Sequence, residues 1–442
     1  MKLFQRLLVA PAALGLLAPI AANATEVNLN DISNYSNESL EIDSNSFSNQ
    51  TTINPLLAGG EGLNHNHDGG DSFSSTTTMT GSAVFAIGQI DGADEIGLRE
   101  TTQTLYQYTL NLNTSFTGDD NLYVRLRTGD EGTSFGKKTA AYHPNRYSST
   151  ADVLAVDKIW YQFPIGDNTT AWVAPKIENY YMYAATPSLY RPAAQKAFKL
   201  GGNSAVFGAS TAAGVGVKYQ VEDSPWALST NVVSKGADTA AGFLSDGDQS
   251  KWDTMIAYTK PQWHGSLTVS SQHNGWSSFS YYATSKAAKL DNSAMADGSY
   301  TSEGTTYDAP NSLAYALRTY WRPAESGTIT PEVTLGYDVL NVSNNGTGKV
   351  KEANSYMIGL GWADMFRADD RIGAAFGAPL RATSLEGDGD PNDVDATMWE
   401  IYYSFKPNDS ITVIPAVFGA SDILADSEDD ITGVMVTTKF KF

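Results

Sequence analysis

A closed antiparallel transmembrane β-barrel of 16 strands, with a mobile N-terminal periplasmic extension, is the all-β fold that the sequence predicts. Short runs of alternating apolar and polar residues fill the chain from about residue 74 onward, and a period of two is typical of strands. Short polar turns alternate with longer connections between these runs, as in outer-membrane barrels. Glycine (39) and tyrosine (23) are plentiful while charged residues make up only 18%. This composition fits strands that face lipid on one side and water on the other.

Residues 1–24 have the pattern of a secretory signal peptide. Lys2 and Arg6 give a basic start, residues 7–20 form an apolar core, and Ala22-Asn23-Ala24 matches a cleavage site. The core is shorter than the ~20 residues that a membrane-spanning helix needs, so export is favoured over a helical anchor. The formal net charge of −20 argues against nucleic acid as a partner.

Residues 25–73 are predicted to form a periplasmic extension before the barrel, which occupies residues 74–442. The segment holds acidic residues but no Lys or Arg, and it is rich in Ser and Asn. Because so few apolar residues cannot offset the entropy lost on folding, we expect the segment to be mobile. His65-Asn66-His67-Asp68 could bind a transition metal, but two histidines in a mobile stretch make a weak site, and a plain linker is favoured.

Seventeen alternating runs follow, whereas bacterial single-chain barrels have even strand numbers. We therefore assign 204–210 to a connection and expect 16 strands, with 18 as the alternative if 276–286 is a strand. Pro331 and Pro415 fall inside runs, although proline cannot donate to a strand ladder, so each should lie at a bulge or rim or mark a wrong boundary. The runs are 75–88, 102–116, 121–129, 154–163, 169–177, 204–210, 213–222, 225–233, 251–261, 263–273, 311–322, 327–340, 353–363, 371–379, 394–407, 410–420 and 430–442.

The last run shows the alternation most clearly. One of its faces carries Val434, Val436, Thr438, Phe440 and Phe442, and the other carries Gly433, Met435, Thr437, Lys439 and Lys441. Bacterial outer-membrane barrels resemble this, since their closing strand usually ends in a Phe that the assembly machinery reads. Phe442 is therefore the predicted assembly signal, and aromatic residues near other run ends predict girdles at the two membrane interfaces.

Charged side chains fall consistently opposite the apolar face of these runs. An Arg or Lys on the lipid face costs roughly 2–4 kcal/mol at the membrane midplane, so we expect such residues to face a water-filled lumen, which about 16 strands are wide enough to enclose. A soluble sandwich with a solvated outer face is the alternative. The predicted pore-lining residues are Arg125, Arg127, Lys158, Arg318, Arg322, Glu332, Asp338, Glu400, Lys439 and Lys441.

Two longer connections could fold inward and narrow the pore. The first, 131–152, carries Lys137, Lys138, His143 and Arg146. The second, 178–203, supplies the constriction candidates Tyr190, Arg191, Lys196 and Lys199, with further tyrosines beside them. Basic residues beside aromatic rings at a constriction favour anionic solutes or stack against sugar rings. An ordinary surface loop is the alternative for each.

The sequence offers no catalytic, metal or cofactor site. None of the five histidines lies beside a recognisable nucleophile motif, and G-x-S-x-G does not occur. Residues 388–393 resemble a calcium-binding loop in their Asp and Gly spacing but lack the downstream Glu, so a solvated loop is favoured. We expect no enzymatic activity, no bound metal and no cofactor.

Several stretches together resemble the major porins of cyanobacterial outer membranes. They are Leu56-Leu57-Ala58-Gly59-Gly60-Glu61-Gly62-Leu63, Ser75-Thr76-Thr77-Thr78-Met79-Thr80-Gly81, residues 110–118 and the mature start at 27–31. That family is similar to carbohydrate-selective porins and is associated with passage of inorganic ions, including iron, and of small organic solutes. Typical members carry a surface-layer-homology domain before the barrel. Only about 20 residues are available for it here, which argues against contact with peptidoglycan.

We therefore expect an integral protein of the cell outer membrane that acts as a passive diffusion channel for small hydrophilic solutes and inorganic ions. A substrate-selective carbohydrate porin is the first alternative, and a structural or adhesive barrel with a plugged lumen is the second. The expected partners are outer-membrane lipid, the solutes themselves and the barrel assembly machinery. A homotrimer is the usual state of barrels of this size.

Overall fold

The computed structural model describes residues 76–442 apart from gaps at 93–100, 130–151, 203–204, 208–210, 240–241, 246, 277–278, 280–282, 292–298, 303–304, 344–345, 388 and 426–429. The predicted signal peptide, the extension 25–73 and the histidine motif at 65–68 lie outside the described residues. So do Lys137, Lys138, His143 and Arg146 of the first candidate constriction loop.

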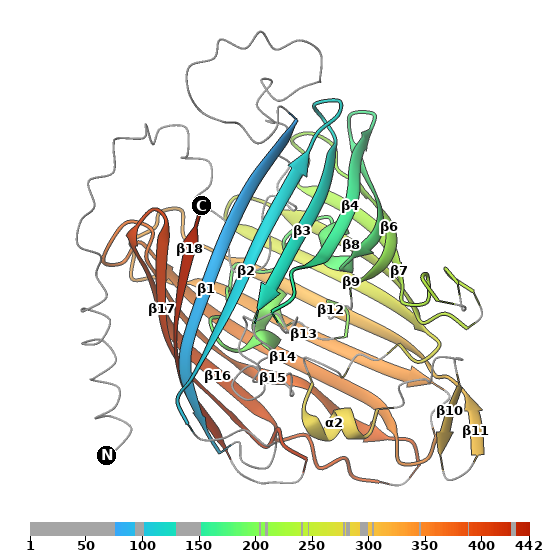
Figure 1. The fold of residues 1–442 in the computed structure, drawn as a ribbon. Helices are drawn as coiled ribbons and strands as arrows, with labels where there is room; N and C mark the ends of the chain where they lie inside the picture. Colours follow the sequence, from blue (N-terminus) through green and yellow to red (C-terminus); the bar gives the residue numbers. More distant parts are fainter. Residues whose placement is uncertain are drawn as a thin grey trace. The chain divides into compact units, whose positions relative to one another are not determined.

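Sixteen strands close into one antiparallel barrel, which confirms the predicted fold (Figure 1). The last strand, β18, pairs with β1 and so closes the sheet. A closed sheet leaves no unpaired edge, as a lipid environment requires. The strands are β1 (Thr77–Asp91), β2 (Gln103–Thr114), β3 (Asn121–Gly129), β4 (Ala155–Ile165), β5 (Thr169–Ile177), β6 (Ala212–Tyr219), β7 (Trp226–Ser234), β8 (Ser250–Thr259), β9 (Trp263–His273), β12 (Asn311–Trp321), β13 (Glu332–Ser343), β14 (Val350–Ala363), β15 (Arg371–Leu385), β16 (Thr397–Asn408), β17 (Ile411–Ser421) and β18 (Ile431–Lys441).

Two stretches that could change the strand count contribute no strand to the barrel in their described residues. The described residues of 204–210 form a turn, so their assignment to a connection is confirmed. The described residues of 276–286 contain no barrel strand, and the short helix α2 (Ser285–Lys289) begins within them. The same long connection holds a separate two-stranded sheet of β10 (Ser299–Ser302) and β11 (Thr305–Asp308).

The two prolines have different explanations. β13 begins at Glu332, so Pro331 precedes the strand and the predicted start at 327 is wrong. Pro415 lies inside β17, where the ladder to β16 pairs Tyr402 with Ala416 and Phe405 with Val413 but skips Pro415 between them. The skip follows because the proline nitrogen has no proton to donate.

Two connections are placed differently from the prediction. β13 continues to Ser343 and β14 begins at Val350, so the connection between the predicted runs 327–340 and 353–363 shortens to 344–349. β15 continues to Leu385, so the connection between the predicted runs 371–379 and 394–407 becomes 386–396. Periodicity fades toward strand ends at the barrel rim, where both faces can be polar, and sequence alternation therefore underestimates strand length there.

Outward and inward side chains alternate along the strands as predicted. On β12, Leu317 is 56% exposed while Arg318 is completely buried, and on β16 Ile401 is 51% exposed while Glu400 is completely buried. The exterior is thus apolar, of the kind that meets lipid, and the charged groups turn inward.

Aromatic side chains gather at strand ends beside the short turns. Trp226 packs against Tyr258 with ring centroids 4.9 Å apart, and Trp263 packs against Trp321 at 6.1 Å. Rings at this level suit a membrane interface. In the part of the chain that the structure describes, no helix is long and apolar enough to cross a membrane.

Candidate functional site

The connection between β5 and β6 enters the barrel. Residues 178–202 and 205–207, here called the lumen segment, contain η6 (Asn179–Met182) and η7 (Lys196–Gly201). The segment hydrogen-bonds to Ser229 on β7, Arg318 on β12, Thr334 on β13 and Glu400 on β16. These strands lie far apart around a closed sheet, and one segment can touch them all only from within. The strand faces that it contacts are therefore the inward faces.

An ion pair between β12 and β13 holds the returning end of the lumen segment. Arg318 Nη2 lies 2.8 Å from Asp338 Oδ2, and both side chains are completely buried. The guanidinium also donates to Leu200 O at 2.9 Å and to Gly202 O. Because arginine presents several donors in one plane, it can bind the carboxylate and the segment backbone at once.

Glu400 on β16 holds the far end of the lumen segment. Its Oε1 accepts from the Tyr190 hydroxyl at 2.7 Å and from Ala193 N at 3.1 Å. Its Oε2 accepts from Ala194 N at 2.9 Å and from Gln195 N at 2.7 Å. Three successive backbone N–H groups thus converge on one carboxylate, an arrangement that suits an anion.

A third contact fixes the lumen segment to β8. Asn179 Nδ2 donates to Asp253 Oδ2 at 2.7 Å. Lys251 Nζ donates to Ala205 O at 2.7 Å and to Val206 O at 2.5 Å. The segment is thereby fastened at three places along the arc of strands from β8 to β16, which leaves its position well defined.

Inward glycines make room for the lumen segment. A Cβ added at Gly336 on β13 would lie 1.6 Å from Gly201 O, and one at Gly359 on β14 would lie 2.7 Å from the Tyr190 ring. No side chain fits between strand and segment at either place. The small inward residues are thus part of how the segment is seated.

Replacing Gly336 by alanine should displace the end of the lumen segment, since the new methyl group overlaps backbone. We expect a loss of about 1–3 kcal/mol in unfolding free energy and a changed single-channel conductance in planar bilayers. Gly265→Ala is the matched control, because a Cβ at Gly265 on β9 would meet nothing within 4 Å. Equal behaviour of the two variants would contradict this packing.

The lumen segment also brings aromatic side chains inward. Tyr180, Tyr181 and Tyr183 belong to one buried apolar cluster, and Tyr190 and Phe198 belong to a second one against β15–β18. Lys199 Nζ lies 5.2 Å from the centroid of the Tyr180 ring. Part of the lumen is therefore packed protein rather than solvent.

Polar side chains occupy part of the inward faces of β18 and β1–β4, beside apolar ones such as Val84 and Met435. Strand register places Lys441 opposite Ser82, Ser82 opposite Thr109 and Thr109 opposite Arg127. The next row runs from Thr80 through Asn111 and Arg125 to Lys158. We call the following set the polar wall: Thr80, Ser82, Gln107, Thr109, Asn111, Arg125, Arg127, Lys158, Lys439 and Lys441.

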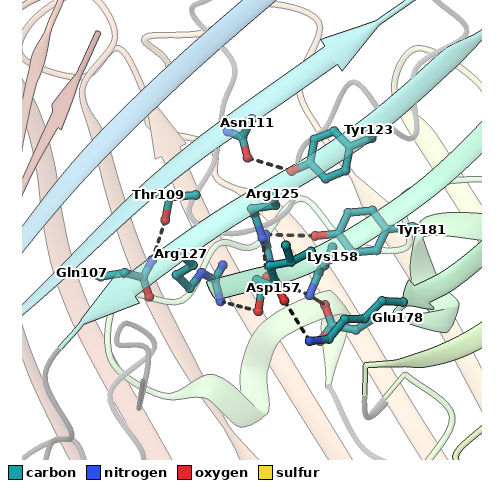
Figure 2. Close-up of polar contacts among 12 residues, drawn as sticks. Gln107, Thr109, Asn111, Tyr123, Arg125, Arg127, Asp157, Lys158, Glu178 and Tyr181 are labelled. Carbon is teal, nitrogen blue, oxygen red and sulfur yellow. Dashed lines mark hydrogen bonds and ion pairs between the residues drawn. The ribbon is translucent and has the colours of Figure 1, made fainter. Parts of the chain in front are cut away.

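The centre of the polar wall is a network of charged groups (Figure 2). Arg125 pairs with Asp157 and donates to the Tyr181 hydroxyl at 3.3 Å. Lys158 Nζ lies 2.5 Å from Glu178 Oε2 and 3.4 Å from Asp157 Oδ2. Arg127 Nη1 lies 3.8 Å from Asp157 Oδ1. Three cations thus surround two carboxylates beside the lumen segment.

Glu178, at the start of the lumen segment, is ionised in this network. Burial by itself raises its pKa, but the charges of Lys158, Lys199 and Arg125 outweigh burial and bring the pKa down to about 2. Glu178 therefore stays ionised at any physiological pH.

A β-bulge explains why Asp157 belongs to this network. The register between β3 and β4 shifts after the pair Arg125↔Lys158, so that Leu126 faces Val156 and Asp157 is the extra residue. A bulge lets two successive side chains turn to the same side. Strict alternation had placed Asp157 on the lipid face, which is why the sequence pattern did not single it out.

The other sequence-predicted residues are distributed around the lumen. Glu332 pairs with Arg371, which also donates to Leu189 O at 3.1 Å. Arg191 lies beside this pair and Tyr402, close enough for their charges to act on it. Lys196 is half-buried. The residues that the structure brings onto the lumen segment or directly against it are Tyr190, Arg191, Lys196, Lys199, Arg125, Lys158, Arg318, Asp338 and Glu400.

Arg322 differs from its predicted place on a lumen-facing strand. β12 ends at Trp321, so Arg322 lies in the connection 322–331, where it is exposed and donates to Pro261 O at 2.5 Å. Pro323 follows directly, and the residue before a proline leaves regular structure readily. The predicted assembly signal, Phe442, is the last residue of the chain. It exchanges backbone hydrogen bonds with Gly81 and stacks on Tyr108.

The predicted solvated loop at 388–393 is only partly solvated. Asp393 is completely buried and accepts hydrogen bonds from Thr284 and from Ala382 N, whereas Asp390 is exposed. The sequence did not reveal this contact because Thr284 comes from a different connection. Within the described ranges, no group of three or more His, Asp or Glu side chains could hold a metal ion.

Comparison with known proteins gives one family. Residues 52–418 match the model of the carbohydrate-selective porin, OprB family. The solved structure of Pseudomonas putida OprB at high pH is similar in fold, with a TM-score of 0.55 at 11% identity over 83% of this chain and 94% of that one. A mutant porin of Rh. blastica gives a TM-score of 0.49 at 10% identity over 83% and 100%. No curated protein sequence matches the chain.

Proposed function

The chain belongs to the OprB family of carbohydrate-selective porins, and from this membership and the polar wall we propose that it passes small hydrophilic solutes, sugars among them, by passive diffusion across the outer membrane. The observation that carries the proposal is a closed barrel of 16 strands whose inward face bears hydroxyl, amide and guanidinium groups. Such groups replace the hydrogen bonds that a solute makes to water.

Sugars suit this wall for a specific reason. Hydroxyl-rich solutes need hydrogen-bond donors and acceptors in close succession. Thr80 and Asn111 lie opposite each other on β1 and β2 and are both partly exposed, with a hydroxyl on one strand and an amide on the next. Tyr123 donates to Asn111 Oδ1 at 2.7 Å and is buried against Trp160, so these rings support the amide from behind.

Inorganic anions are the second candidate class. The polar wall contributes five cations, namely Arg125, Arg127, Lys158, Lys439 and Lys441, against the carboxylates of Asp157 and Glu178. A pore wall with an excess of positive charge favours anions over cations. Passage of iron stays a prediction from the cyanobacterial resemblance, and no described residue supports it.

Liposome swelling tests the proposal directly. Vesicles that contain the refolded protein should swell in isotonic glucose and more slowly in larger oligosaccharides, because diffusion through a narrow lumen depends on solute size. Vesicles without protein are the control. Absence of swelling in every solute would reject the proposal and favour the structural barrel with a plugged lumen.

Charge removal from the polar wall should change ion selectivity. The double variant Arg127→Ala with Lys439→Ala should lower the anion-to-cation permeability ratio at least roughly two-fold, read as a shift of reversal potential across a salt gradient in planar bilayers. Lys351→Ala is the matched control, since Lys351 is half-exposed at the rim and pairs with Glu386. An unchanged reversal potential in the double variant would remove the wall from the ion path.

Assembly and partners remain part of the proposal. A homotrimer in outer-membrane lipid and recognition of Phe442 by the assembly machinery are predictions. Chemical crosslinking of the folded protein tests the first, and Phe442→Ala, with its insertion yield into the outer membrane measured in cells, tests the second.

A further inference from the structure

A second segment folds inward at the end of the barrel that carries the longer connections. It comprises residues 283–290 with α2, from the connection between β9 and β12. Ala287 is completely buried in the same apolar cluster as Leu340, Ala353 and Ala382. Leu340 is two residues after Asp338 on β13, so both side chains point inward. The strand register places Leu340 opposite Ala353, and Ala353 opposite Ala382. The segment therefore packs on the inward face of β13–β15.

This segment is tied to several connections around the mouth of the barrel. Thr284 N donates to Leu380 O at 2.9 Å, and Val350 N donates to Leu290 O at 3.2 Å. Ser285 N donates to Ile423 O at 2.8 Å, and Ala425 N donates to Ser285 Oγ at 2.8 Å. A chain that leaves β9 thus reaches the starts and ends of β14, β15 and β17, and spans part of the mouth.

The buried side chain of Asp393 fastens residues 283–290 to the rest of the barrel. Asp393 Oδ2 accepts from Thr284 Oγ1 at 2.7 Å and from Ala382 N at 2.7 Å. Thr284 also caps α2, because its hydroxyl accepts from Ala287 N at 3.0 Å. Asp393 Oδ1 is buried without a hydrogen-bond partner among the described residues, so the ionised form leaves an uncompensated oxygen.

The charged groups around Asp393 do not offset the free-energy cost of ionising this buried carboxyl group. Lys286 of α2 donates to Asn392 O at 2.8 Å, and Arg381 of β15 donates to Val394 O. Burial raises the pKa of Asp393 to about 6, because it outweighs the hydrogen bonds from Thr284 and Ala382 N and the charges of Lys286 and Arg381, which lower the pKa. Asp390 and Asp395 of the same connection are exposed.

We propose that residues 283–290 are a second closure of the lumen, latched through Thr284 and Asp393, and that the latch loosens when Asp393 becomes ionised. The inference rests on the proposed porin function. A carboxyl group whose pKa is raised in the latched state stabilises that state fully below its ordinary pKa of about 3.9, and the contribution is lost as the pH rises through about 6. The closure is accordingly tight in acid and looser near neutral pH.

Thiol labelling can follow the opening of the latch without recording ionic current through the channel. The chain has no cysteine, so Ala287→Cys places a single thiol on the buried side of α2, and Ala288→Cys places one on its exposed side. The ratio of the two labelling rates with a charged methanethiosulfonate cancels the thiol's own pH dependence. We expect the ratio of buried to exposed labelling to rise about ten-fold between pH 5 and pH 7.5.

Asp393→Asn provides the decisive variant, because an amide keeps the acceptor for Thr284 and Ala382 but cannot ionise. In this background the labelling ratio should stay low at both pH values, and the single-channel conductance, lower at pH 5 than at pH 7.5 in the parent, should no longer depend on this pH change. A flat ratio in the parent, or an undiminished pH response in Asp393→Asn, overturns the latch. Absence of conductance at both pH values would reject the porin function, whereas the labelling result would stand by itself.

Discussion

Replacing Arg318 by methionine is expected to lower the unfolding free energy by about 3–5 kcal/mol, the cost of breaking a buried ion pair. Methionine fills a similar volume but removes the guanidinium that pairs with the completely buried Asp338 carboxylate. It also removes the donors to Leu200 O and Gly202 O. Urea titration of the protein refolded into lipid vesicles measures the loss.

Two further variants separate stability from positioning. Arg318→Met with Asp338→Leu removes both charges, and replacing a buried pair by apolar groups is often neutral. Its stability should therefore recover, while its single-channel conductance should stay altered because the lumen segment still lacks its tether. Lys351→Ala, which breaks an exposed pair with Glu386, should cost no more than about 1 kcal/mol. If Arg318→Met were as mild as this control, the ion pair would not hold the segment.

The barrel itself could be predicted from the sequence because the alternation of apolar and polar residues can be recognised within each single strand. Alternation along runs such as 430–442 depends only on which face of a strand meets lipid. The even number of strands in such barrels removed 204–210 from the count. Local rules fail where the geometry departs from period two, as at the bulge that turns Asp157 inward beside Lys158.

The lumen segment could be recognised as a candidate but its path could not. Its basic and aromatic content pointed to residues 178–203, yet Arg318 and Glu400 meet it across more than a hundred residues of sequence. No composition or spacing encodes such a contact. Gly336 and Gly359 were a usable signal, since glycines on inward strand positions mark places where another backbone approaches closely.

Glu400→Gln is expected to release the far end of the lumen segment although the substitution is nearly isosteric. The carboxylate accepts four hydrogen bonds, two on each oxygen. A glutamine keeps one accepting oxygen and turns an NH2 group toward backbone N–H donors, so either Ala194 and Gln195 or Tyr190 and Ala193 lose their acceptor. Hydrogen bonds to a charged group contribute roughly 1.5–3 kcal/mol each, so we expect a loss of about 3 kcal/mol or more.

Current recordings distinguish this release from a general loss of stability. A segment that is freed at one end but still tied by Arg318 and Asp253 should move between positions, so open-channel noise should increase at voltages where the parent is quiet. Glu325→Gln, in the exposed connection after β12, makes the same chemical change away from the segment and should leave both noise and stability unchanged. Quiet, parent-like currents from Glu400→Gln would mean that packing of Tyr190 and Phe198 against β15–β18 suffices to hold the segment, and that the four hydrogen bonds add nothing to its position.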